Sequence, residues 1–85
     1  MNDDYERELE SFYKEQVEWY KKQLKWYNHE IEWLNEVIKR EKNEWGYSLQ
    51  GENFIRERVE YYRRRKQCKL NVTKYEKLLM KNYEE

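Results

Sequence analysis

The chain lacks the residues that usually cross-link, interrupt or anchor a small protein. Its 85 residues include no proline, no alanine, two glycines and one cysteine, and its charges sum to zero. A single cysteine excludes a disulfide scaffold, and the absence of any run of about 18 apolar residues excludes a membrane span. Zero net charge argues against a protein that binds nucleic acid simply by being basic overall.

Charged and aromatic residues are present in large amounts instead. Asp, Glu, Lys and Arg make up 42% of the chain, and aromatic residues make up 18%. Disordered segments are poor in aromatic residues, whereas these recur at regular spacing, so an ordered single domain of residues 1–85 is predicted. A domain of this length buries only a small core and often gains stability by forming oligomers.

Two glycines divide the chain into two predicted helices. Gly46 and Gly51 are the only strong breaks, so we expect helices at about 3–45 and about 53–83, with a turn at about 46–52. Gly46 is expected to end the first helix in the left-handed conformation. Long helices joined by a short turn pack side by side. The predicted fold is therefore an all-α antiparallel helical hairpin resembling a coiled coil.

A heptad seam runs along the first predicted helix. Its aromatic and aliphatic residues alternate at steps of three and four, which keeps one side of the helix turned toward a partner. We expect this seam to pack against the second helix within the chain. Its members are Tyr13, Val17, Tyr20, Leu24, Tyr27, Ile31, Leu34 and Ile38.

A second row of aromatic residues lies beside the seam. At about 100° per residue, this row neighbours the seam, so one partner helix cannot cover both. Four large rings form a patch larger than a soluble monomer normally exposes. The first expectation is that a second copy covers them, giving a homodimeric four-helix bundle, and the second is that a different protein binds there. This predicted oligomer or partner interface comprises Phe12, Trp19, Trp26, Trp33 and Val37.

The second predicted helix carries a basic segment. Residues 56 to 69 hold seven basic side chains against two acidic ones, a balance of +5. Arginines interleaved with tyrosines can neutralise phosphates while the rings stack on bases, so nucleic acid or an acidic protein is an alternative partner. The residues concerned are Arg56, Arg58, Tyr62, Arg63, Arg64, Arg65, Lys66 and Lys69.

A competing interpretation pairs this basic segment with the first helix. The expected turn places residue 65 near residue 33, close to Glu30, Glu32 and Glu36. Residues 1–45 carry 8 − 12 = −4 charges and residues 46–85 carry 10 − 6 = +4, so the two arms attract each other. Ion pairs between helices fix their orientation and register.

No group of residues points to catalysis, a metal or a cofactor. His29 and Cys68 are the only histidine and cysteine, whereas a transition-metal site usually needs three or four ligands. The glycines are not followed by the Lys-Ser/Thr of a phosphate loop. Many carboxylates sit four residues before a base, the spacing of surface ion pairs. These pairs are Glu10 with Lys14, Glu18 with Lys22, Glu36 with Arg40 and Glu60 with Arg64.

The predicted function is that of a non-catalytic protein–protein interaction module, a small adaptor, regulator or inhibitor. The amino-acid usage resembles that of AT-rich genomes, which suggests a phage or mobile-element protein acting on a host protein. The alternatives are a nucleic-acid-binding protein that uses the basic segment and a structural subunit of a larger helical assembly. The acidic start of the chain is unlike a secretory signal, so a cytoplasmic setting is expected. Charges of both signs on the polar side of the first helix argue against membrane binding.

Overall fold

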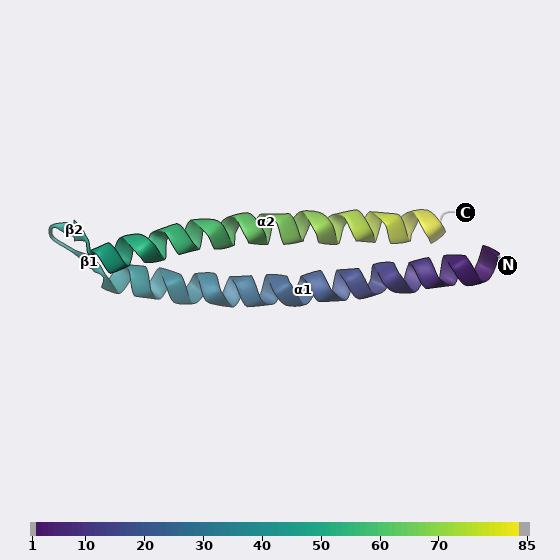
Figure 1. The fold of residues 1–85 in the computed structure, drawn as a ribbon, viewed down its shortest axis with the longest axis horizontal. Helices are drawn as coiled ribbons and strands as arrows, with labels where there is room; N and C mark the ends of the chain where they lie inside the picture. Colours follow the sequence, from purple (N-terminus) through teal and green to yellow (C-terminus); the bar gives the residue numbers. More distant parts are fainter. Residues whose placement is uncertain (1, 84–85) are drawn as a thin grey trace.

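The chain forms two long helices joined by a small β-hairpin (Figure 1). The computed structural model describes residues 2–83. Helix α1 spans Asn2–Arg40, strands β1 and β2 span Lys42–Asn43 and Gly46–Tyr47, and helix α2 spans Leu49–Tyr83. The helices run antiparallel, so the chain ends lie together, far from the hairpin. The antiparallel helical hairpin predicted from the sequence is confirmed.

The molecule is a thin rod with a small core. It measures 67 × 15 × 14 Å, and its radius of gyration of 19.1 Å exceeds the roughly 12 Å of a compact chain of this length. A single layer of side chains separates the two helices, so few of them are shielded on all sides. The buried apolar residues among those described are Val17, Ile31, Leu34, Ile38 and Cys68.

The chain reverses through a β-hairpin, which the sequence did not predict. Helix α1 ends at Arg40, and β1 then pairs with β2 through Asn43 and Gly46. The Asn43 side-chain oxygen accepts a hydrogen bond from the Trp45 backbone N–H at 2.9 Å. Asparagine at the start and glycine at the end suit a type I turn. Gly46 has a φ of 106° and supplies the left-handed residue of the hairpin, so its expected role as a helix terminator is wrong.

Helix α2 begins earlier than the expected position 53 because Ser48 caps it. The Ser48 hydroxyl accepts a hydrogen bond from the Gly51 N–H at 3.0 Å and donates one to Glu41 at 2.9 Å. Gly51 is buried where the two helices come together. A Cβ atom there would lie 3.0 Å from the Cβ of Glu41, so a larger residue would need this contact to open by a few tenths of an ångström.

The helix pairing also differs from the expected register. Arg65 donates a hydrogen bond to the side-chain oxygen of Asn28 at 3.1 Å, and so it does not lie beside residue 33. Arg58 makes the corresponding bond to Asn35 at 2.7 Å, one heptad nearer the hairpin. The expected register is wrong because the chain reverses at 44–45 instead of within 46–52.

Candidate interaction surface

The heptad seam of α1 faces α2 along the whole rod. Every one of its eight predicted members is buried or half-buried. Tyr20 stacks on Tyr75 with ring centroids 6.1 Å apart, and Tyr27 lies 5.8 Å from Tyr61. Leu34 is completely shielded from solvent. These contacts hold α1 in one rotation about its axis, which determines where its other residues point.

The row of large rings beside the seam is left half exposed. Phe12, Trp19, Trp26 and Trp33, called here the aromatic flank, retain 47%, 53%, 47% and 51% exposure. Val37 lies beside this row near the hairpin and is half-buried. The packing of α2 against the seam therefore leaves a line of aromatic surface open to solvent.

The inner edge of the aromatic flank is held by rings of α2 at a regular interval. Trp33 meets Phe54 edge-on with centroids 5.9 Å apart, and Trp26 meets Tyr61 at 5.7 Å. Phe12 meets Tyr75 in the same way at 6.4 Å. Such edge-to-face pairs contribute about 0.5–1.5 kcal/mol each beyond the area they bury.

Cys68 occupies the remaining position of this series. The ring partners on α2 lie at positions 54, 61 and 75, and the same seven-residue step reaches Cys68 opposite Trp19. Trp19 is the most exposed ring of the flank. The sequence alone did not identify these residues as partners of the flank, although their spacing of seven residues on α2 was a signal for them.

The opposite side of the seam is closed by polar contacts. Two residues after each tryptophan, about 200° further round the helix, α1 carries a polar side chain that reaches α2. We call this side the polar flank. Its contacts are Lys21 with Glu76 at 3.3 Å, Asn28 with Arg65 at 3.1 Å and Asn35 with Arg58 at 2.7 Å.

The basic segment of α2 is divided between the seam and the surface. Arg58 and Arg65 are half-buried in the seam, and the Arg65 guanidinium lies 5.0 Å from the ring centre of Tyr62. Within residues 2–83, the expected ion pairs between this segment and acidic residues of α1 do not form. Arg58 and Arg65 bond to Asn35 and Asn28 instead. Lys21 and Glu76 form the only ion pair between helices among the described residues.

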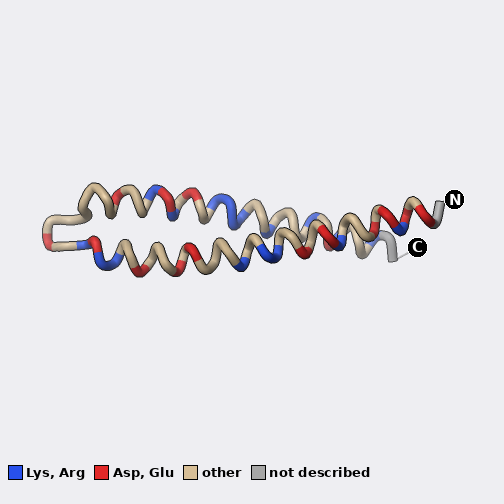
Figure 2. The backbone as a smooth tube through the Cα atoms, turned by 60° about the horizontal axis from the view of Figure 1, so that its bottom comes forward, with Lys and Arg blue, Asp and Glu red and all other residues tan. Residues whose placement is uncertain are grey.

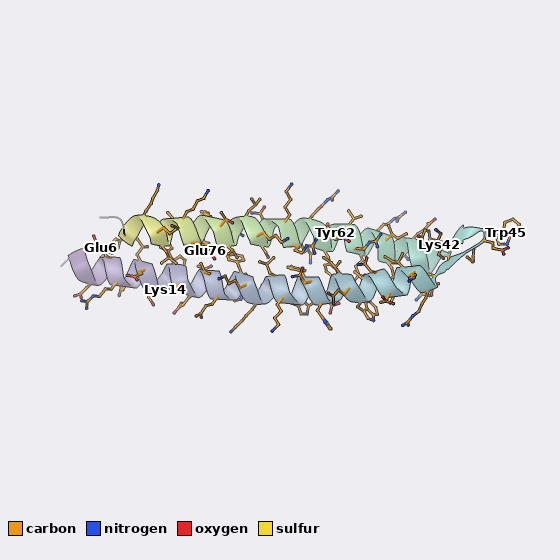
Figure 3. The ribbon with its side chains drawn as sticks, turned by 180° about the vertical axis from the view of Figure 1, so that it is seen from behind. Glu6, Lys14, Lys42, Trp45, Tyr62 and Glu76 are labelled. Atoms are coloured by element: carbon orange, nitrogen blue, oxygen red, sulfur yellow. The ribbon has the colours of Figure 1, made fainter. Side chains whose placement is uncertain are left out.

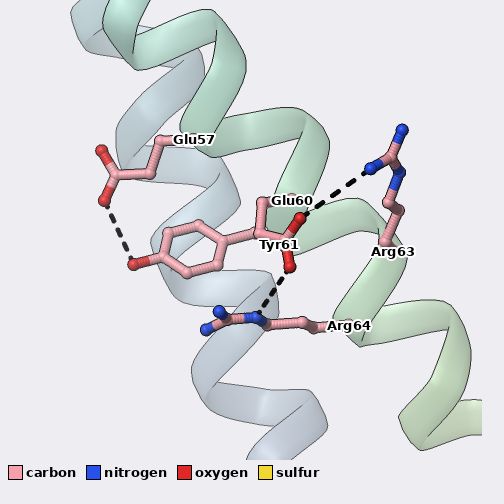
Figure 4. A network of polar contacts seen from close by, with 5 residues as sticks. All are labelled: Glu57, Glu60, Tyr61, Arg63 and Arg64. Atoms are coloured by element: carbon pink, nitrogen blue, oxygen red, sulfur yellow. Dashed lines mark hydrogen bonds and ion pairs between the residues drawn. The ribbon is translucent and has the colours of Figure 1, made fainter.

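On the surface, the segment makes a small network within α2 (Figure 4). Arg64 donates to Glu60 at 3.2 Å, and Arg63 lies 4.0 Å from the same carboxylate. This hydrogen bond to Glu60 raises the pKa of the Arg64 guanidinium. Tyr61 donates to Glu57 at 3.2 Å, and partial burial together with that carboxylate raises the pKa of the phenol. Arg56, Lys66 and Lys69 are exposed, and Tyr62 is 39% exposed.

Two of the four ion pairs expected at the (i, i+4) spacing are present. Glu10 lies 3.0 Å from Lys14, and Glu60 lies 3.2 Å from Arg64. Lys22 and Glu36 take part in no ion pair among the described residues. Both are exposed on the outer rim of the aromatic flank.

Further apolar surface is exposed at the tip of the hairpin. Trp45 is 94% exposed and projects away from the rod (Figure 3). Tyr47 and Leu49 beside it are 40% and 77% exposed. Because α1 ends at Arg40, Trp45 does not continue the seam along that helix.

Few other features suggest chemistry. A shallow hollow beside Trp26 is lined by Lys22, Lys25 and His29. Within residues 2–83, no three potential metal-ligating side chains of His, Cys, Asp or Glu come together. In the same part of the chain, neither helix has an apolar stretch that would let it cross a membrane.

The Cys68 thiol should resist modification in the folded protein. Burial raises its pKa above the usual value, so the folded state holds the thiol proton more tightly than the unfolded chain. The bound thiol proton therefore contributes fully to the stability of the fold below about pH 8.5, and this contribution falls as the pH rises above that value. We expect reaction with a thiol reagent at pH 8 to be much slower in buffer than in denaturant. Equal rates would contradict this placement of the thiol.

Comparisons with known proteins identify no relative of this chain. No protein-family model matches the chain, and neither curated proteins nor solved structures yield a match. The interpretation of the surface therefore rests on the geometry of the hairpin itself.

Proposed function

We propose that the protein is a non-catalytic interaction module that binds another protein chain through its aromatic flank. The observation that carries this proposal is the row of four half-exposed rings at seven-residue intervals along one side of α1. Contiguous apolar patches of this kind on soluble proteins mark interaction sites. Aromatic residues are also enriched where protein interfaces contribute most of their binding energy.

The arrangement of the flank suits binding without rearrangement. Three of the four rings are held edge-on by rings of α2, and the seam fixes the rotation of α1. A partner would therefore meet a surface that is already ordered, which lowers the entropic cost of association. A small regulator or inhibitor of this kind, such as a phage-encoded protein acting on a host protein, needs ordered interaction surfaces and no catalytic group.

The distribution of the arginines favours a protein partner over nucleic acid. Arg58 and Arg65 are turned into the seam, and Arg63 and Arg64 share the carboxylate of Glu60. Fewer charges are therefore free to contact phosphates than the seven of the sequence would suggest. Each arginine that already bonds within the protein makes one phosphate contact fewer, which weakens binding to nucleic acid.

Site-specific cross-linking tests the proposal. We would introduce the photoreactive residue benzoylphenylalanine at Gln23, which is half-buried between Trp19 and Trp26. The matched control carries it at Lys66, on the exposed surface of α2. In the native cells, we expect cross-links to a protein chain from position 23 and few from position 66. No protein cross-link from position 23, or cross-links to nucleic acid from position 66 alone, would overturn the proposal.

A further inference from the structure

We infer that the partner on the aromatic flank is a second copy of the chain, lying antiparallel with a two-fold axis close to His29. This inference rests on the proposed function and specifies the occupant of the same surface. Three independent features support it: the surface that the hairpin leaves exposed, the order of charges beside the flank, and the order of residues within the flank itself.

The exposed surface is larger than a stable monomer of this mass requires. The hairpin exposes 7388 Å², whereas a compact chain of 11.1 kDa exposes roughly 5,700 Å². The excess of roughly 1,700 Å² per chain is about twice the roughly 800 Å² that each partner of a standard interface buries, so the hairpin has ample surface for one. With five buried apolar residues described, the core within one hairpin is small. A second copy would reduce the exposed area and enlarge the buried apolar core.

Charges along the outer rim of the flank change sign in a definite order. The residue three positions after each aromatic ring lies beside it on the helix surface. These rim residues are Glu15, Lys22, His29 and Glu36, so an acid, a lysine, a histidine and an acid follow one another. All four are exposed. Figure 2 shows the corresponding alternation of acidic and basic blocks along α1.

Only with an antiparallel partner do opposite charges on the rims of the two chains come together. In a parallel copy the two-fold axis runs along the helices, so the two rims lie on opposite sides of the contact and Lys22 does not meet Glu36. An antiparallel copy centred on His29 sets Lys22 against the partner's Glu36 twice over, as two-fold symmetry requires. Moving the partner by one heptad in one direction sets Glu15 against the partner's Glu36. Moving it by one heptad in the other direction separates Lys22 from the partner's Glu36.

The same arrangement matches the residues of the aromatic flank. Trp26 comes within one residue of the level of the partner's Trp33, so the two central rings of each chain lie close together. Trp19 likewise comes within one residue of the level of the partner's Arg40, which is exposed and seven residues beyond Trp33. A guanidinium over the ring of tryptophan is a favourable cation–π pair.

The hairpin tip also finds a neighbour in this arrangement. Each hairpin tip lies beyond Arg40 in the direction of the partner's Phe12, so the exposed Trp45 is on the side of the open end of that flank. A parallel copy would place the two tips together instead.

Cysteine cross-linking tests the orientation of the two copies. In a Cys68→Ala background, H29C should oxidise to a covalent dimer, because residue 29 lies beside its own copy at the axis. E36C alone should stay monomeric under denaturing conditions, whereas an equimolar mixture of K22C and E36C should form mixed dimers. A dimeric protein that forms no mixed dimer from K22C and E36C would overturn the inference.

A charge exchange tests the same pairing without cysteine. K22E or E36K should each weaken dimerisation by about tenfold, because each variant sets like charges together twice per dimer. The double variant K22E/E36K should recover wild-type affinity. The two positions are 14 residues apart on one helix, so rescue requires contact between chains. E32K, a charge change at an exposed residue one turn before Glu36 and farther round the helix from the rings, serves as the control and should have a much smaller effect.

The oligomeric state separates this inference from the proposed function. Light scattering at micromolar concentration should report a dimer for the purified protein. A monomer would overturn the inference, yet the proposed function would still be supported if position 23 cross-linked to a different protein. A monomer whose position 23 cross-links to no protein at all would overturn both.

Discussion

Leu34→Ala should lower the free energy of unfolding by about 2–5 kcal/mol, the usual cost of removing a buried leucine side chain. Leu34 is the largest fully buried residue described and lies in the seam between the buried Ile31 and Ile38. Small domains are stable by only about 5–15 kcal/mol, so this single change would remove much of the total. Urea unfolding followed by circular dichroism measures it, at one fixed protein concentration because dimerisation adds to apparent stability.

Leu70→Ala is the matched control for this prediction. It removes the same atoms from α2 at a position that is 55% exposed. Because those atoms already contact water, we expect a change within about 0.5 kcal/mol. Equal losses for the two variants would mean that the seam is not the core of the fold.

Replacing Arg58 and Arg65 together by leucine should raise the free energy of unfolding by about 1–4 kcal/mol. Both arginines are half-buried at seam positions that a heptad pattern would fill with apolar residues. Each keeps a positive charge against a neutral asparagine, and the Nε atom of Arg58 is buried without a hydrogen-bond partner. Asn28 and Asn35 are exposed, so water can replace the hydrogen bonds that they lose.

Two further variants separate the contributions of these arginines. R63L changes an arginine whose side chain is 76% exposed, and we expect little change in the unfolding midpoint. N35L leaves Arg58 half-buried without its acceptor and should cost about 1–3 kcal/mol. A double leucine variant less stable than the wild type would show that the arginine–asparagine bonds outweigh the cost of partial burial.

The arginines at 58 and 65 also bear on specificity. Polar residues at seam positions fix the register of paired helices at a cost in stability. The two bonds to Asn35 and Asn28 repeat one heptad apart and require the same register, so a slipped pairing would break both. This explains why a hairpin with a small core retains two charged residues in its seam.

The fold was predictable because its signals are local. The heptad seam and the scarcity of glycine and proline each act within a few residues, and together they predicted two antiparallel helices. The β-hairpin was missed because Gly46 suits either a helix end or a type I turn. The hydrogen bond from the Trp45 N–H to Asn43, together with strand pairing, determines which one forms.

The candidate surface was predictable only in part. The row of rings could be recognised from its seven-residue spacing, and the structure leaves each ring about half exposed. Its partners on α2 and the asparagines that meet Arg58 and Arg65 depend on the register. A shift in the turn of a few residues changes every such pair.

The sequence alone determined that this chain forms two amphipathic helices and that one of them carries more aromatic surface than a single partner helix can cover. Helical periodicity is a property of neighbouring residues, so no knowledge of the rest of the fold was needed. Only the tertiary structure decided the register, the arginine–asparagine contacts and the flank that stays open. Those depend on where the chain reverses, and the reversal point is selected by all the contacts along the rod together.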